Sequence, residues 1–324
     1  MAKKTRKKTK KKIKQPGFLA RSYVAIIDKE NASLRRLLMC FVVFTALAVV
    51  AVWGFGRMES YVKAVHQQRN VVVHPKFLDL PEWIDPEKYT RDRGVDKKRC
   101  EDILNSISNF VDVKSENQDF ILDEDLAQLY LQKLGENPWI KSVRQVQKTY
   151  DGIINVDCEF RHPIAKITDT SRGCECYLDA DGIVLPATNP LPTSCHVVEI
   201  KDYRTRLPLP GGQVESRDIL SALEILASIS KYQKSQPANC NLWRELAKLS
   251  LKNFDGRNDR KSPHIMLYTS REVPIRWGTR IGNETAMVEP PAEHKLEMLF
   301  REYNIGGNGS FNILKVVELC LYDR

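Results

Sequence analysis

The sequence predicts an α+β protein that is attached to a membrane by a single helix near its N-terminus. Three features support this prediction: an apolar run without charges, two segments of helical spacing between alternating segments, and many short alternating segments in the second half. We divide the chain into a basic tail, a membrane helix, a linker and two folded domains. Their expected ranges are 1–36, 37–56, 57–70, 71–166 and 167–324.

The first 36 residues form a strongly basic tail. They carry 13 Lys and Arg against two acidic residues, a net charge of +11 in a chain whose total is +9. Such a tail is attracted to anionic lipid headgroups at a membrane surface. The alternative is nucleic-acid binding, but the stretch between Met1 and Phe18 has no aromatic side chain that stacks on bases. We therefore expect lipid headgroups, and no nucleic acid, as partners of the tail.

The run from Leu37 to Phe55 contains 19 residues without a charge. A helix of about 20 apolar residues crosses the hydrocarbon core of a bilayer. Because Lys and Arg stay on the cytoplasmic side, we expect a single-pass inner-membrane protein with a cytoplasmic N-terminus and periplasmic or extracytoplasmic domains. The competing interpretation is a secretory signal cleaved near Ala46–Ala48. The polar segment 57–70 is expected to be a juxtamembrane helix or linker.

The segment 71–166 is expected to fold in the order strand, helix, helix, strand, strand. Apolar residues at helical spacing predict the two helices, with Asp123 capping the second and Gly135 ending it. Asp151-Gly152 predicts a hairpin turn between the last two strands. We interpret Trp139, at the start of this hairpin, as a core residue. The expected elements are a strand within 71–80, helices at 97–107 and 123–134, and strands at 139–148 and 154–160.

Residues 167–324 are expected to form a mixed α/β domain dominated by an antiparallel sheet. Short alternating segments predict strands, and two segments of helical spacing interrupt them. The expected strands lie at 175–179, 183–185, 197–200, 246–251, 264–269, 273–277 and 311–321, and the expected helices at 219–232 and 292–303.

The last predicted strand, 311–321, is a candidate partner-binding site. The neighbouring sequence leaves little to cover its far side, and an edge strand exposes N–H and C=O groups with which another chain can pair. The alternative is a fully paired central strand, which the nearly continuous apolar run favours. The candidate partner-binding residues are Phe311, Ile313, Lys315, Val317, Glu318 and Leu319.

Seven of the eight cysteines lie beyond the apolar run, where an oxidising compartment permits disulfides. Because Cys174, Cys176 and Cys195 flank the predicted turn at Asp181-Gly182, we expect Cys195 to pair with Cys174 or Cys176. The same thiols with His196 offer an alternative zinc site, but the usual C-x2-C spacing is absent.

The sequence contains no spacing typical of a catalytic site. Its six histidines are scattered, and it has no Gly-x-Ser-x-Gly elbow, Walker loop or dinucleotide fingerprint. Asp179-x-Asp181-Gly182 resembles the start of a calcium loop, but the later ligands are missing, so we predict a hairpin turn there. We therefore expect a protein that is not an enzyme and holds no metal or cofactor.

Several short motifs follow one another along the chain. They are Asn137–Val143 (NPWIKSV), Glu159–Ala165 (EFRHPIA), Tyr177–Pro186 (YLDADGIVLP) and Pro274–Gly278 (PIRWG), with Lys295-Leu296 in the next predicted helix. Their succession resembles the FtsQ/DivIB family of cell-division proteins. The tail is longer and more lysine-rich than is usual in that family, which indicates a divergent member. The resemblance implies a POTRA domain at 71–166 followed by a β domain at 167–324.

The resemblance also implies a function. Members of the family are scaffolds of the divisome, which bind small coiled-coil membrane proteins of the FtsB and FtsL types and help regulate septal wall synthesis during septation. They use the end of the β domain for binding, which supports the edge interpretation of 311–321. The alternatives are another envelope assembly or transport accessory protein with a POTRA-like module and, third, an enzyme of wall metabolism.

Overall fold

The computed structural model describes residues 32–68, 75–89, 94–111, 126–149, 153–187, 190–237, 240–305, 311 and 316–320. The chain divides into two compact units, Met1–Asn70 and Val71–Arg324. The predicted cap at Asp123 and the predicted turn at Asp151-Gly152 lie outside the described residues.

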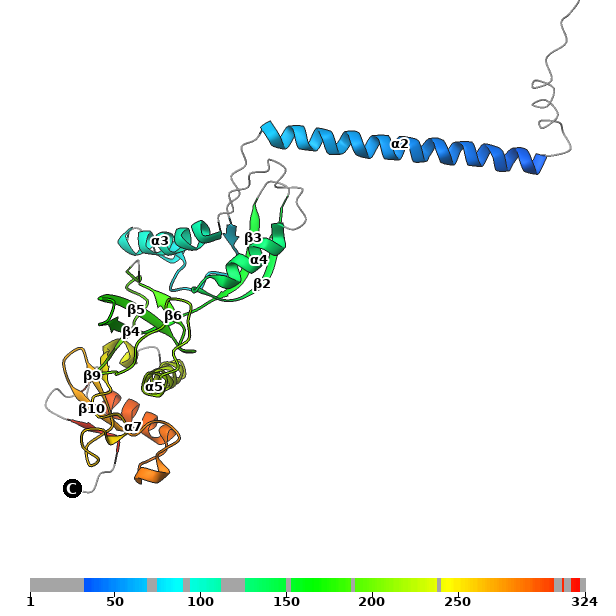
Figure 1. The fold of residues 1–324 in the computed structure, drawn as a ribbon. Coiled ribbons are helices and arrows are strands. Elements are labelled where there is room, and N and C mark those ends of the chain that lie inside the picture. The colour runs from blue at the N-terminus through cyan, green and yellow to red at the C-terminus, as the bar shows by residue number, and fades with distance from the viewer. Residues whose placement is uncertain are drawn as a thin grey trace, which may run out of the picture. The chain divides into compact units, whose positions relative to one another are not determined.

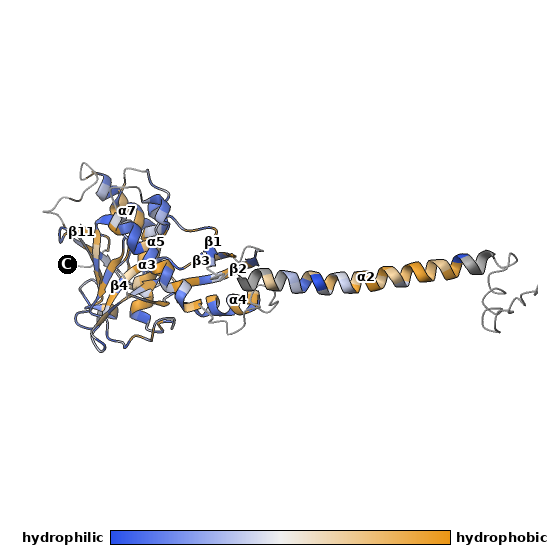
Figure 2. Ribbon diagram, turned by 90° about the horizontal axis from the view of Figure 1, so that it is seen from above, coloured by the Kyte–Doolittle hydropathy of each residue, from blue (hydrophilic) through white to orange (hydrophobic). Residues whose placement is uncertain are grey.

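The first unit contains one long helix, α2, which spans Ala32–Gln68 (Figure 1). At about 1.5 Å per residue, this helix is about 55 Å long. Its span Arg36–Tyr61 has a mean hydropathy of 2.5 and no buried residues, and it is long and apolar enough to cross a membrane. Figure 2 shows the apolar residues in orange along this part of α2. The predicted apolar helix is confirmed, and it continues to Gln68, so the segment 57–70, predicted as a juxtamembrane helix or linker, is mostly helical.

The second unit begins with a three-stranded sheet of order β1-β3-β2. Strand β1 runs parallel to β3, and β2 runs antiparallel to β3. Helices α3 and α4 lie between β1 and β2 in the sequence, and α4 packs on β2. The elements are β1 (Pro75–Phe77), the 3-10 helix η2 (Pro86–Lys88), α3 (Gly94–Val111), α4 (Leu126–Glu136), β2 (Ile140–Lys148) and β3 (Ile154–Phe160).

Apolar spacing explains the core of this part. Helix α3 buries Ile103, Ile107 and Val111, which lie four residues apart and so share one face of a helix. Trp139 is 3% exposed and packs on Trp83, with ring centroids 6.0 Å apart. The prediction that Trp139 is a core residue is confirmed. Helix α4 continues through the predicted stop at Gly135 and ends one residue later.

A larger sheet of eight strands follows, with the order β11-β10-β9-β8-β7-β4-β5-β6. Two longer helices and short helical turns connect its strands (Figure 1). The strands are β4 (Pro163–Asp169), β5 (Cys174–Asp179), β6 (Val184–Pro186), β7 (Val198–Lys201), β8 (Leu246–Ser250), β9 (Ile265–Thr269), β10 (Pro274–Gly278) and β11 (Val317–Glu318). The helices are α5 (Arg217–Gln233), α6 (Leu242–Glu245), η4 (Phe254–Gly256), η5 (Thr285–Met287) and α7 (Ala292–Ile305).

This sheet is mixed: among its described strands, four pairs are antiparallel, as expected, and three are parallel. The pairs β4 with β7, β7 with β8 and β10 with β11 are parallel. For two of these pairs the reason lies in the connection: α5 lies between β7 and β8 and α7 between β10 and β11, and a crossover helix returns the chain in the same direction. Between β4 and β7 the chain instead passes through β5 and β6.

Strand β5 separates two hydrophobic cores. Cys176 and Leu178 belong to the core that the large sheet forms with α5 and α7, whereas Tyr177 belongs to the core of the small sheet. Successive side chains of a strand point to opposite faces, so one strand serves both cores. Figure 1 shows β4, β5 and β6 between the small sheet and α5. Strand β4 runs through the predicted domain boundary at 166 and belongs to the large sheet.

Candidate partner-docking edge

Strand β11 lies at one end of the large sheet. It pairs in parallel with β10, with Val317 opposite Ile275 and Glu318 opposite Arg276. In the part of the chain that the structure describes, no strand pairs with its other side. The structure therefore places an edge strand within the predicted segment 311–321, although the strand is shorter than predicted.

Of the two residues of β11, Glu318 is the one whose backbone N–H and C=O point away from β10. Leu319 donates its backbone N–H to the carbonyl oxygen of Arg276 at 3.0 Å, so Leu319 faces β10. Backbone groups alternate along a strand, which turns Val317 toward β10 and the N–H and C=O of Glu318 outward. The Glu318 side chain accepts a hydrogen bond from Arg276 at 2.7 Å, and both side chains are nearly half exposed, so this ion pair contributes little stability.

The predicted partner-binding residues divide between the core and the surface. Val317 and Leu319 are buried, and Phe311 packs on Tyr303 of α7 with ring centroids 5.2 Å apart. Glu318 is exposed. Ile313 and Lys315 lie outside the described residues. The buried members therefore hold the strand on the domain, while the backbone of Glu318 faces away from β10.

A buried ion pair lies beside this edge. Lys295 of α7 and Glu289 have no exposed side-chain surface, and the Lys295 Nζ lies 2.5 Å from the Glu289 Oε2. The Glu289 carboxylate also accepts the backbone N–H of Thr279, at 2.9 Å to Oε2. The Lys295 ammonium lies 5.5 Å from the centre of the Trp277 ring, within range of a cation–π interaction. Charges withdrawn from water in this way require such partners.

Because Gly278 has no Cβ, the Glu289 carboxylate of this ion pair can lie directly against the end of β10. The φ of Gly278, +95°, favours glycine, and β10 has a bulge between Arg276 and Gly278 in its pairing with β9. A Cβ at position 278 would collide with the Glu289 carboxylate and lie 2.7 Å from the Cβ of Cys320. The carboxylate is therefore packed against the chain just after β11.

The three cysteines predicted to form a disulfide are free thiols in the structure. Cys176 points into the core of the large sheet, and Cys195 into the core of the small sheet, where its thiol lies 3.9 Å from the Pro163 carbonyl oxygen. Cys174 is exposed at the start of β5. Burial raises the pKa of the Cys176 thiol to about 11 and that of Cys195 to about 12, so both stay protonated and react slowly. The bridge predicted between Cys195 and either partner is not formed in this structure.

The predicted hairpin turn at Asp179 to Gly182 is confirmed. Asp179 accepts the backbone N–H groups of Asp181, at 3.0 Å, and Ile183, at 2.7 Å, and so closes the turn itself. Arg161 pairs with the other oxygen of Asp179 at 2.8 Å. No group of three His, Cys, Asp or Glu that could hold a metal occurs among the described residues.

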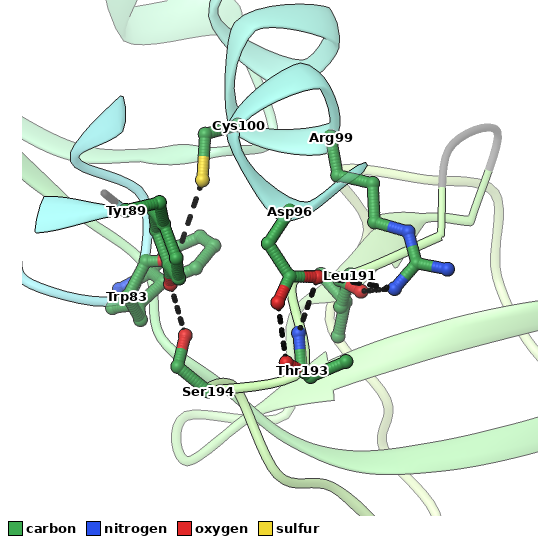
Figure 3. Close-up of polar contacts among 8 residues, drawn as sticks. All are labelled: Trp83, Tyr89, Asp96, Arg99, Cys100, Leu191, Thr193 and Ser194. Atoms are coloured by element: carbon green, nitrogen blue, oxygen red, sulfur yellow. Dashed lines mark hydrogen bonds and ion pairs between the residues drawn. The ribbon is translucent and has the colours of Figure 1, made fainter. Parts of the chain in front are cut away.

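A polar junction joins the small sheet's helices to a loop of the large sheet (Figure 3). Asp96 of α3 accepts both the backbone N–H, at 3.1 Å, and the hydroxyl of Thr193. Arg99 donates to the carbonyl oxygen of Leu191 at 3.3 Å, and the hydroxyls of Tyr89 and Ser194 share a hydrogen bond. The sequence does not predict this junction, because hydrogen bonds between a helix and a distant loop leave no periodic pattern.

A cleft of about 460 Å³ opens where the two parts of this unit meet. It is lined by side chains that include His162, His196 and Trp243. Burial lowers the pKa of His162, aided by the charge of Lys234, and burial also lowers the pKa of His196. Both imidazoles are therefore neutral at neutral pH.

The sequence matches no protein-family model and no curated protein.

Proposed function

We propose that this chain is a single-pass scaffold of the bacterial divisome, similar to FtsQ/DivIB proteins, that holds small coiled-coil division proteins at the edge of its large sheet. The observation that carries the proposal is the open backbone of Glu318 on β11, at the end of the domain where the resembling family binds its partners. Paired main-chain groups give a docked strand its affinity, and neighbouring side chains give it specificity.

The fold supports the proposal in a second way. A unit of strand, helix, helix, strand, strand precedes the larger sheet directly, which is the order expected of a POTRA domain followed by a β domain. The apolar span of α2 supports a membrane anchor. The basic residues before it support a cytoplasmic N-terminus and exported domains.

Depletion of the protein in its own organism tests the proposal. Cells that lose a divisome scaffold grow without septating, so we expect filaments with regularly spaced nucleoids and without septa. Re-expression of the full chain restores division, whereas re-expression of a chain without residues 32–68 does not. Normal division after depletion contradicts the proposal.

Orientation is tested separately. A periplasm-dependent alkaline phosphatase fused after residue 324 is expected to be active, and a fusion after residue 30 inactive. The opposite pattern overturns the proposed membrane topology but leaves the docking edge untouched.

A further inference from the structure

Four buried nitrogen atoms without a hydrogen-bond partner lie around the short helix η4. Among the described residues, six buried side-chain nitrogen and oxygen atoms lack such a partner, and four of them belong to Arg257, His264 and Arg280. They are the Nε of each arginine and both ring nitrogens of His264, which is 5% exposed. Buried polar groups are almost always hydrogen-bonded, so several unpaired ones together indicate a place where water or an ion binds. We call these three residues the η4 cluster.

The fold gathers the η4 cluster at one end of the large sheet. Arg257 follows β8, His264 precedes β9 and Arg280 follows β10, and these strands are antiparallel neighbours. The Arg280 Nε lies 3.9 Å from Oδ1 of Asp255, which belongs to η4. A Cβ on Gly256 would lie 3.0 Å from the Nε2 of His264, so the imidazole reaches the same turn. Antiparallel pairing therefore places the three side chains around one turn.

Arginines outnumber carboxylates around this turn. Arg217, at the start of α5, lies 3.9 Å from Oδ2 of Asp255. Arg257 lies 3.5 Å from Oδ2 of Asp218, and the stem of Arg260 approaches the backbone of the turn. Together with the second arginine of the η4 cluster, four arginines stand against two aspartates, which leaves two positive charges in excess. The distances to Asp255 are too long for direct hydrogen bonds, so its carboxylate does not complete the donors.

The missing partners are hydrogen-bond acceptors. The Nε of arginine only donates, and an imidazole carries at least one N–H in either protonation state. A water molecule would accept these bonds but needs acceptors for its own two protons, whereas an oxyanion supplies both acceptors and negative charge. Among oxyanions, phosphate matches the planar fork of donors that a guanidinium group presents. Helix α5 begins beside the cluster, and the positive end of its dipole also favours an anion.

We propose that the η4 cluster binds one phosphate group, as inorganic phosphate or as the phosphate of a monoester. Arg257 and Arg280 donate through Nε, and His264 donates through one ring N–H. The Arg280 side chain is 25% exposed and that of Arg217 is 62% exposed, so the phosphate enters from the solvent side, where Arg217 adds charge. The inference does not depend on the proposed function, because partner docking uses β11 and this site lies at η4.

Titration of the detergent-solubilised full chain with inorganic phosphate tests the inference. Calorimetry gives Kd, tryptophan fluorescence gives Tm, and chloride keeps the ionic strength constant. We expect saturable binding of one phosphate per chain and a rise in Tm that chloride does not produce. Arg257→Lys and Arg280→Lys keep the positive charge but lose the Nε–H and the planar fork, so each is expected to raise Kd roughly tenfold.

Two exposed arginines supply the comparison variants. Arg217→Gln removes one charge from the rim of the site and is expected to raise Kd by about threefold. Arg244 precedes β8, at the opposite end of this strand from η4, so Arg244→Gln is the matched control and is expected to leave Kd unchanged. If one lysine variant no longer melts cooperatively, the other lysine variant and Arg217→Gln give the same comparison.

Two results would overturn the inference. If phosphate binds without saturation and raises Tm no more than chloride, water occupies the η4 cluster. If Arg244→Gln weakens binding as much as Arg280→Lys, the attraction is a diffuse effect of surface charge and not a site. Glycerol 3-phosphate then distinguishes the two sources: equal affinity for both probes supports a phosphomonoester, and binding of inorganic phosphate alone supports the free ion.

Discussion

Glu289 and Lys295 are two opposite charges without exposed side-chain surface, and each depends on the other. Removing one partner of a buried pair leaves the other charge uncompensated, which destabilises a protein by about 3–5 kcal/mol. Lys295→Met is therefore expected to lower the free energy of unfolding by about that amount, as measured by urea denaturation.

The double variant Glu289→Gln with Lys295→Met is the control for this prediction. It removes both charges but keeps a carbonyl oxygen for the Thr279 N–H, so most of the lost stability is expected to return. A Lys295→Met variant as stable as the parent shows that water reaches the pair and contradicts its burial.

His162 and His196 give the protein a predictable pH dependence. Burial depresses both pKa values below 6.5 in the folded state, so the unfolded chain binds more protons at acidic pH. Stability is then fully present above pH 6.5 and decreases as the pH falls through this value toward the folded pKa. Each histidine contributes a slope of at most about 1.4 kcal/mol per pH unit.

Urea denaturation of the full chain at pH values from 7.5 to 5.5 measures this slope. The double variant His162→Gln with His196→Gln is expected to flatten it, and His294→Gln, an exposed position, serves as the control. A slope that is the same in all three proteins contradicts the assignment of the titration to these buried imidazoles.

At the scale of elements, β11 is the strand on which the proposed partner binding depends. Proline at position 318 removes the N–H that faces the open side, but it leaves the Leu319 bond to Arg276 in place. Glu318→Pro is therefore expected to abolish binding of the exported segment of an FtsB-type protein, measured by biolayer interferometry, while Tm decreases little. Val317→Pro alters the side of the strand that faces β10, so it is expected to destabilise the domain as well.

Glu318→Lys tests whether charge or backbone matters at this position. The substitution keeps the N–H and the C=O, so binding is expected to persist if strand addition provides the affinity. Binding that survives Glu318→Pro but is lost in Glu318→Lys indicates recognition of the carboxylate instead of strand pairing.

The sequence predicts where the strands lie better than it predicts which strands pair and in which direction. Alternation located β5, β8 and β9 to within two residues, because alternation reflects local burial. The parallel strand pairs were not predicted, because the direction of a strand depends on the connection before it, such as the crossover helices α5 and α7, and not on its own residues. The predicted strand at 311–321 was too long, because its apolar run also supplies core residues outside β11.

The buried Glu289 and Lys295 were missed for a related reason. Charged residues in a proline-rich segment and on a helix are usually exposed, so neither residue type indicates burial. One signal was present: Lys295, Leu299 and Tyr303 are spaced four residues apart, and therefore lie on the same buried face of α7. A lysine on an apolar stripe predicts a buried acidic partner.

At the scale of the second unit, two cores meet at β5. The polar junction around Asp96 adds hydrogen bonds between α3 and the loop that carries Leu191 and Thr193 (Figure 3). Core contacts such as those of Tyr177 are not directional, whereas hydrogen bonds fix an orientation. We therefore expect the junction to contribute to the orientation of the small sheet relative to the large sheet.

Substitution at Asp96 tests this role. Asp96→Ala removes the two hydrogen bonds that the buried Asp96 carboxylate accepts from Thr193, which is expected to cost about 1–3 kcal/mol of stability. If the junction couples the two sheets, urea unfolding of the variant separates into two transitions, because each core then unfolds by itself.

Lys97→Ala, at a neighbouring exposed residue of α3, is the control and is expected to change stability by less than about 0.5 kcal/mol. A single cooperative transition in Asp96→Ala, with the parent's midpoint, shows instead that apolar packing around β5 is sufficient to hold the two sheets together.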